Sequence, residues 1–167
     1  MWEIVSSLSA IIVPSFVCYV SIRNSNKITN QQEVNRLREL EETKKSLLFG
    51  FKTEIESIYS QYMVQCGNNL NNHQKGQVFQ YIFPVNQNYF SFYESNTRGI
   101  SSLDAELVVE IITLYNNMKG LLDTFHLHND MLMNNLNIYA YSDKLKDQHD
   151  KLLIIYQKCM TAIQRYD

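Results

Sequence analysis

Glycine and proline are scarce in this 167-residue sequence, which holds five and two of them respectively. Because these residues mark tight turns and helix ends, their scarcity argues against an all-β fold and allows long helices. The net charge is only −2, so the chain lacks the basic character of a nucleic-acid-binding protein. Three cysteines, an odd number without a Cys-x-x-Cys motif, favour free thiols in a reducing compartment.

Charged side chains are absent from one stretch, Ile4 to Ile22. As a helix it would span about 28 Å, close to the ~30 Å hydrocarbon core of a bilayer. Its serines and Pro14 are tolerated in membrane helices, and Trp2 and Tyr19 suit the two lipid–water interfaces. We therefore predict a single-pass membrane anchor over residues 1–24, in contact with membrane lipid.

Two other interpretations of this stretch stay open. A cleaved signal peptide would need a basic start and a small-residue cleavage site, whereas Glu3 is the only charged residue before the stretch. Phe16 and Val17 before Cys18 also match a lipoprotein cleavage site poorly. A helix that is buried, or that lies on the membrane surface, is the other alternative, although the stretch lacks the Lys and Arg typical of surface binding.

The charges that flank the anchor predict its orientation. Arg23 and Lys27 follow it directly, and Arg36 and Arg38 come soon after. By the positive-inside rule the N-terminus lies outside and the long C-terminal part lies in the cytoplasm.

Residues 25–46 have the composition of a solvated, juxtamembrane helical stalk. Thr29 or Asn30 is a candidate cap for a new helix, and charge pairs such as Glu33–Arg36 and Glu41–Lys45 have favourable spacing. The apolar line along it consists of Val34, Leu37 and Leu40. This line is one heptad long, so we favour a helix that stands off the membrane over a short coiled-coil seam between two copies.

Residues 47–167 carry three apolar stripes with helical spacing, and we predict an all-α antiparallel bundle of three principal helices. The first stripe consists of Leu47, Leu48, Phe51, Ile55, Ile58, Tyr59, Tyr62 and Met63. The second consists of Leu107, Val108, Ile111, Tyr115, Met118, Leu122, Phe125 and Leu132, on a helix capped by Ser101 or Ser102 and ending near Asn134. The third, on a helix beginning near Ser142, consists of Leu145, Leu152, Tyr156, Cys159, Ile163 and Tyr166.

The least regular segment, residues 78–99, is rich in aromatic residues and contains the helix breaker Pro84. We expect short helical turns that fill the fourth side of the bundle. Its aromatic residues are core residues in one interpretation and a surface for a protein partner in the other. The candidate partner surface consists of Phe90, Phe92, Tyr93, Glu94 and Asn96.

The sequence yields no candidate catalytic, cofactor-binding or metal-binding site. His126 and His128 are two residues apart, so on a helix they point to different faces and cannot easily share a metal ion. Cys159 lies on an apolar stripe, as an inert core thiol would. Phosphate-binding loops and nucleophile motifs are missing.

The order of segments in this chain supports a comparison with known proteins. The predicted anchor is followed by a charged helix and then by a run of aromatic, polar and aliphatic residues. The run is Phe92-Tyr93-Glu94-x-Asn96-x-x-Gly99-Ile100, followed by Leu103 and Ile111-Ile112-x-x-Tyr115. This order resembles a group of uncharacterised small bacterial membrane-anchored helical proteins, some of them similar to prophage or defence-island products. The resemblance implies a bacterial inner-membrane setting and no activity, and it transfers no functional residues.

These observations predict a non-enzymatic membrane protein whose cytoplasmic bundle binds a protein partner or a second copy of itself. The alternative is an effector that assembles through its transmembrane helix and permeabilises the membrane. It is motivated by the small residues Ser6 and Ala10, which are four positions apart.

Overall fold

A computed structural model describes the backbone of residues 2–134 and 138–166, and the side chains of this range from residue 21 onward. The described residues form helices and connecting loops without a strand, which confirms the all-α prediction. The chain divides into two compact units, residues 1–43 and 44–167. Each unit is described separately below.

The long helix α1, Trp2–Tyr62, contributes to both units. It continues through the predicted stalk without a break, so the expectation of a new helix at Thr29 is wrong. The Thr29 hydroxyl donates to the carbonyl of Ser25 at 3.0 Å, inside the helix, and does not cap a helix start. Glu33 and Arg36 form the predicted ion pair at 2.9 Å, and Arg38 pairs with Glu42 at 3.0 Å.

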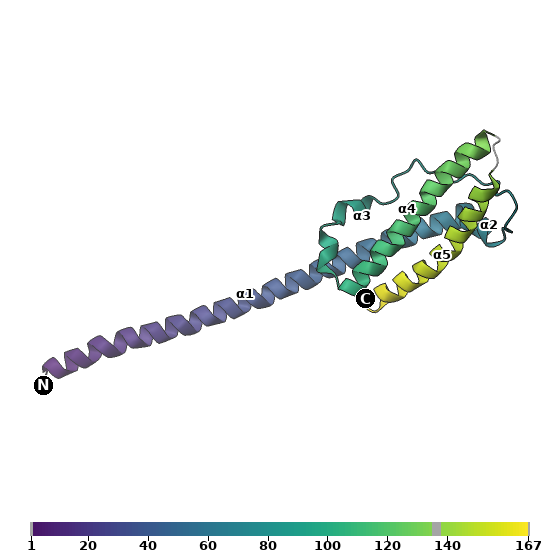
Figure 1. Ribbon diagram of the computed structural model, residues 1–167. Coiled ribbons are helices and arrows are strands. Elements are labelled where there is room, and N and C mark those ends of the chain that lie inside the picture. The colour runs from purple at the N-terminus through teal and green to yellow at the C-terminus, as the bar shows by residue number, and fades with distance from the viewer. Residues whose placement is uncertain (1, 135–137, 167) are drawn as a thin grey trace. The chain divides into compact units, whose positions relative to one another are not determined.

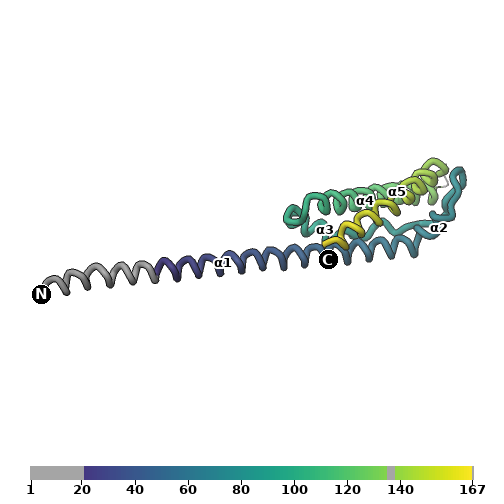
Figure 2. Tube along the Cα trace, turned by 90° about the horizontal axis from the view of Figure 1, so that it is seen from below, coloured from purple at the N-terminus to yellow at the C-terminus, as the bar shows by residue number. Residues whose placement is uncertain are grey.

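In unit 2, the last part of α1 leads into a π-helical turn, Met63–Gly67, and a short helix α2, Asn68–Asn71. The segment 72–90 then runs to α3, Ser91–Asn96, and a 3-10 turn, Gly99–Ser102. Two long helices follow, α4 at Ala105–Met133 and α5 at Tyr139–Gln164. Figure 1 shows α4 and α5 side by side, and Figure 2 shows the same pair from below.

Ring contacts establish the directions of the three long helices in the bundle. Tyr59 of α1 stacks on Tyr156 of α5 at 3.5 Å, and further along α1 Tyr62 lies against the earlier residue His149 of α5. The helices α1 and α5 are therefore antiparallel. Phe51 of α1 contacts Tyr115 of α4, and Tyr62 contacts Phe125, so α1 and α4 run in the same direction.

The parallel arrangement of α1 and α4 differs from an all-antiparallel bundle, and the connection explains it. Residues 72–104 carry the chain back along the bundle before α4 begins. The short helical turns predicted for residues 78–99 occur only in α3 and the 3-10 turn, whereas residues 78–90 cover one side of the bundle without a helix. Most residues of the predicted stripes lie in the core, but Leu114, Leu121, Phe79 and Phe83 from outside the stripes also belong to it, and Tyr166 of the third stripe is exposed. The largest fully buried side chains of the core include Phe51, Ile55, Leu107, Ile111, Leu114, Tyr115, Phe125, Leu145, Leu152 and Ile163.

Two helix starts differ from their predictions. Ser101 and Ser102 lie in the 3-10 turn and donate to the carbonyls of Arg98 and Gly99, so neither caps α4. The helix α5 begins at Tyr139, before Ser142, whose hydroxyl donates to the carbonyl of Ile138. In both places the serine hydroxyl satisfies a local carbonyl, an alternative to capping that sequence alone does not distinguish.

Candidate functional site

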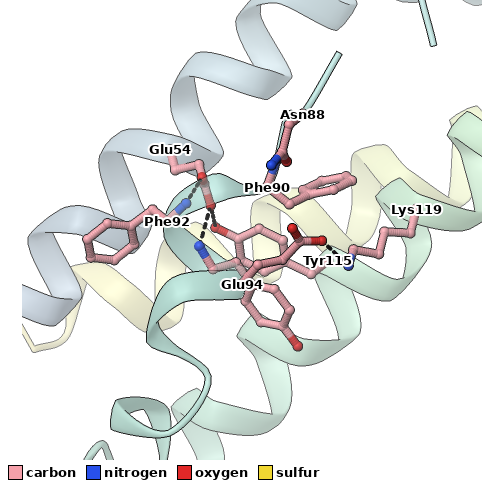
Figure 3. A network of polar contacts seen from close by, with 8 residues as sticks. Glu54, Asn88, Phe90, Phe92, Glu94, Tyr115 and Lys119 are labelled. Carbon is pink, nitrogen blue, oxygen red and sulfur yellow. Dashed lines mark hydrogen bonds and ion pairs between the residues drawn. The ribbon is translucent and has the colours of Figure 1, made fainter. Parts of the chain in front are cut away.

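The predicted partner surface lies on and before α3, and a carboxylate from α1 holds this helix in place. Glu54 accepts hydrogen bonds from the backbone N–H groups of Phe92, at 2.6 Å, and Tyr93, at 3.0 Å (Figure 3). It also accepts a hydrogen bond from the Tyr115 hydroxyl of α4 at 2.6 Å. A negative charge at a helix N-terminus satisfies free N–H groups and suits the helix dipole. One residue thus connects three helices.

The aromatic residues of the predicted surface face mainly into the bundle. Phe90 is buried, and the half-buried Phe92 meets Phe51 edge-on with ring centroids 5.1 Å apart. Tyr93, also half-buried, stacks on Tyr115 at 4.0 Å. These rings therefore stabilise the bundle, and the remaining exposed area of α3 is mostly polar.

The two polar members of the predicted surface have different environments. Asn96 donates to the carbonyl of Phe92 at 2.8 Å, within α3. Glu94 is exposed and forms an ion pair with Lys119 of α4 at 3.0 Å. The Lys119 ammonium group also lies 5.2 Å from the centroid of the Phe90 ring and 5.6 Å from that of Tyr93. The ion pair and these cation–π contacts close the outer edge of the α3–α4 packing.

An open depression of about 440 Å³ lies next to this ion pair. It is lined by Val85, Asn86, Phe90, Lys119, Leu122, Asp123 and His126. Two of its charged or titratable groups already have partners, because Lys119 pairs with Glu94 and His126 lies 3.8 Å from Asp130. The depression is open, and these pairings leave few of its polar groups free for a small ligand.

A second polar cluster is buried between α1, α2 and α5. The Tyr62 hydroxyl donates to Nδ1 of His149 at 2.6 Å, and Nε2–H of His149 donates to the side-chain oxygen of Asn71 at 2.8 Å. Burial lowers the pKa of His149 and raises that of Tyr62, so both groups are neutral. His149 is fully buried and Tyr62 nearly so, so the cluster links three helices and does not face a substrate.

The histidines of α4 lie on different faces, as predicted. His126 is exposed and His128 is fully buried. Among the residues whose side chains are described, no group of three or more His, Cys, Asp or Glu residues could hold a metal ion.

The thiols of the bundle are unsuited to nucleophilic chemistry. Cys66 and Cys159 are free and fully buried, and burial raises their pKa values to about 11 and about 12. Both thiols are therefore protonated at neutral pH, and a protonated thiol is a weak nucleophile. Cys18 lies outside the described side chains.

The predicted anchor lies almost wholly outside the residues whose side chains are described. This applies to Trp2, Ile4, Pro14 and Tyr19. From residue 21 onward, excluding 135–137 and 167, no helix is long and apolar enough to cross a membrane. Arg23 and Lys27 are described and exposed. The anchor therefore stays a prediction from sequence.

Sequence reasoning missed Glu54, the residue that connects α1, α3 and α4. Its partners Phe92, Tyr93 and Tyr115 are 38 to 61 positions away along the chain. No local pattern marks such a residue. The available signal was weak: Glu54 is a carboxylate directly beside Ile55, within an apolar helical stripe.

No protein-family model, curated protein or solved structure matches this chain.

Proposed function

We propose that this protein is a non-enzymatic, single-pass membrane protein of the bacterial inner membrane whose cytoplasmic helices associate with a second copy. The anchor is Ile4 to Ile22, and the positive charges after it orient the bundle toward the cytoplasm. The observation that carries the association is the apolar line of the stalk, which lies on an unbroken helix; we therefore propose the short seam between two copies, the alternative that the sequence alone did not favour. Val34, Leu37 and Leu40 are each about half exposed on α1.

Within unit 1, the described residues offer this apolar line no second element to pack against. In residues 21–43, the part of unit 1 with described side chains, α1 is the only secondary-structure element. A helix without tertiary contacts is marginally stable in water, and exposed apolar side chains favour association. Covering Val34, Leu37 and Leu40 would therefore stabilise the stalk.

A second copy fits this line because of the anchor. Two copies in one membrane present their stalks in parallel and at the same height, so each line would meet its equivalent. Glu33 would then lie near Arg38 of the other copy, five positions further on, and the two could exchange their partners within the helix, Arg36 and Glu42, for an ion pair between copies. The membrane also confines the copies, which raises their effective concentration and compensates for a short contact.

Cysteine cross-linking in membranes tests this proposal. The background carries Cys18→Ser and keeps the buried Cys66 and Cys159. In it, Leu37→Cys should cross-link efficiently with a short bis-maleimide, whereas the matched variant Glu39→Cys, on the opposite face of the helix, should not. Equal cross-linking of both variants, or none at Leu37→Cys in a membrane-bound protein, would refute association through the stalk.

Fractionation with the same variants separates the anchor from the association. A C-terminal tag that stays with membranes and is digested only after spheroplast lysis supports the predicted anchor and orientation. Tagged protein recovered outside the membrane fraction would contradict the anchor, whatever the cross-linking shows. Cross-linking of Leu37→Cys to a different protein would identify a heterologous partner and contradict the proposed second copy.

A further inference from the structure

The segment 72–90, here called the strap, covers one side of the bundle between α2 and α3 (Figure 1). All its residues are described, and they contain no helix or strand. Its backbone is held by side chains of the bundle. The N–H of Gly76 donates to Asp143 at 2.8 Å, and the N–H of Phe79 donates to the Ser142 hydroxyl at 3.0 Å. A segment held by few hydrogen bonds opens more readily than the helices beneath it.

Two aromatic rings attach the strap to α4. Phe79 and Phe83 are 2 % and 1 % exposed, and both contact Phe125, with ring centroids 6.5 Å and 5.3 Å away. The Asn129 amide of α4 donates to the carbonyl of Phe83 at 2.7 Å. Opening of the strap would therefore expose a large apolar surface on both the strap and α4.

His128 lies beneath the strap without a hydrogen bond. Its ring is fully buried, its centroid is 5.9 Å from that of Phe79, and among the described residues neither ring nitrogen has a hydrogen-bond partner. Buried side-chain nitrogens are normally hydrogen-bonded, so this ring is an exception. The Nε2 atom of His73, on the strap, and the side-chain oxygen of Asn129 are also buried without a partner among these residues.

This environment opposes a charge on His128. Burial lowers its pKa; polar contacts with the Phe79 backbone and the Asn129 side chain, which fall short of good hydrogen-bond geometry, partly oppose this shift, and the nearby His73 ring adds a smaller lowering. Among the described residues, His73 is the only titratable side chain that affects the His128 ring. The charged groups at the outer side of the strap, Lys75 and Asp147, are paired with each other.

His149, the other buried histidine of the bundle, is better prepared for a proton. Both its ring nitrogens have partners, Tyr62 and Asn71, and the Tyr62 oxygen can accept a hydrogen bond from a protonated ring. Asp150 also favours the charged form, although Lys146 opposes it. Neither ring nitrogen of His128 has a well-formed hydrogen bond among the described residues, and no carboxylate favours its charged form, so His128 is the more sensitive of the two.

We propose that the strap is an acid-sensitive lid: protonation of His128 opens it and exposes Phe79 and Phe83. In the open strap the imidazole is hydrated and binds a proton near its ordinary pKa of about 6.5. In the closed strap it binds one only at lower pH. The closed state is therefore fully stable above pH ~6.5, and its advantage falls by up to tenfold for each pH unit below this value.

Two native cysteines report on this opening in the full-length protein. The Cys66 thiol lies 3.9 Å from the carbonyl oxygen of Ile82 in the strap, so strap opening uncovers it. Cys159 is equally buried but belongs to α5, among Glu110, Tyr115 and Tyr156 in the core. Labelling of Cys66 alone thus reports local opening, and labelling of both reports unfolding of the bundle.

The experiment measures labelling of Cys66 and Cys159 with dithiodipyridine, which reacts under acidic conditions, by mass spectrometry between pH 7.5 and 5.0. Rates are divided by those of the denatured chain at each pH. We expect protection of Cys66 to fall about fivefold between pH 6.5 and 5.5 while Cys159 stays protected. The matched variant His126→Leu, with a change at the exposed histidine of the same helix, should behave like the wild type.

The variant His128→Leu should remove the pH dependence, and His128→Gln provides a second test if the leucine variant does not fold. Constant protection of Cys66 down to pH 5.0 in the wild type would overturn the proposal. The same pH dependence in a folded His128 variant would also overturn it. Equal loss of protection at Cys66 and Cys159 would show acid unfolding of the bundle, which contradicts a local lid.

Discussion

The contact between Glu54 and the start of α3 makes a quantitative prediction. Replacing Glu54 with Gln keeps its size but removes its charge, and in either orientation the new NH2 group faces a backbone N–H, which cannot accept a hydrogen bond. Hydrogen bonds to a charged group contribute about 1.5–3 kcal/mol each, and a buried donor without a partner costs about 1–3 kcal/mol. Because Glu54 is half-buried, water replaces part of the loss. We expect the free energy of unfolding to fall by about 2 kcal/mol.

The variant Glu94→Gln is the matched control. It makes the same chemical change on α3, but Glu94 is exposed and its ion pair with Lys119 lies at the surface. Exposed ion pairs contribute about 0–1 kcal/mol, so this change should have little effect. Combining Glu54→Gln with Tyr115→Phe should cost less than the sum of the two changes, because the phenylalanine removes one of the unpaired donors.

The assay is a guanidinium titration of the full-length protein with pulsed alkylation of Cys159, read by mass spectrometry. Cys159 is fully buried in the bundle, so its labelling reports unfolding of unit 2 without a contribution from the predicted anchor. The midpoint should move to clearly lower denaturant for Glu54→Gln and hardly at all for Glu94→Gln. Equal shifts for the two variants would refute a structural role of the Glu54 carboxylate.

Two further predictions concern glycines and thiols. A Cβ at Gly50 would collide with the ring of Phe92, so Gly50→Ala should destabilise the bundle by about 1–3 kcal/mol in the same titration. A Cβ at Gly120 would have its nearest neighbour 3.9 Å away, so Gly120→Ala should stabilise the bundle by about 0.5–1 kcal/mol. Burial raises the pKa values of Cys66 and Cys159 to about 11 and about 12. Both thiols should therefore react with maleimide at pH 7.5 far more slowly than in the denatured chain. Equal rates in the folded and denatured states would contradict their burial.

The bundle was predictable because helical periodicity is a local property. Ile111, Tyr115, Met118 and Phe125 recur at three and four residues, and all four are buried. Such a pattern indicates which face of a helix is covered, whatever covers it. The all-α class and the long helices follow from this pattern together with the scarcity of glycine and proline.

Helix ends were less predictable, because hydroxyl side chains have several local partners. Thr29 resembles a cap in sequence, yet its hydroxyl donates to Ser25 within α1. Ser102 donates to Gly99, and α4 begins after Asp104. The choice between capping and bonding back to a carbonyl depends on the backbone conformation that tertiary packing selects. Sequence reasoning can therefore propose a boundary there without fixing it.

The candidate sites show the same division between local and non-local information. His128 follows Phe125 by three residues, so helical periodicity places it on the buried stripe and His126 on the exposed face. Burial of His128 was therefore predictable. Its lack of a hydrogen bond was not predictable, because that depends on the path of the strap, which brings the Phe79 ring against the imidazole. The role of Glu54 was not predictable from its own helix. Its carboxylate accepts hydrogen bonds from α3 and α4, and nothing in the sequence of α1 indicates these partners.

The two proposals concern different parts of the chain. The acid-sensitive lid is the strap, the least regular segment, and the association of two copies uses the exposed stalk. Beneath the strap, the fully buried His128 ring of α4 makes the closed state weaker as acidity rises, while Tyr62 of α1 and Asn71 of α2 keep both ring nitrogens of His149 bonded. The bundle can thus stay folded while the strap opens, because the acid-sensitive His128 lies under the strap, whereas His149 and its partners connect the helices of the bundle. Exposure of Phe79 and Phe83 would then add a second apolar surface to the one formed by the stalk. If stalk contacts hold two copies together, acidification should strengthen their association, and replacement of His128 should remove that effect without changing cross-linking at neutral pH.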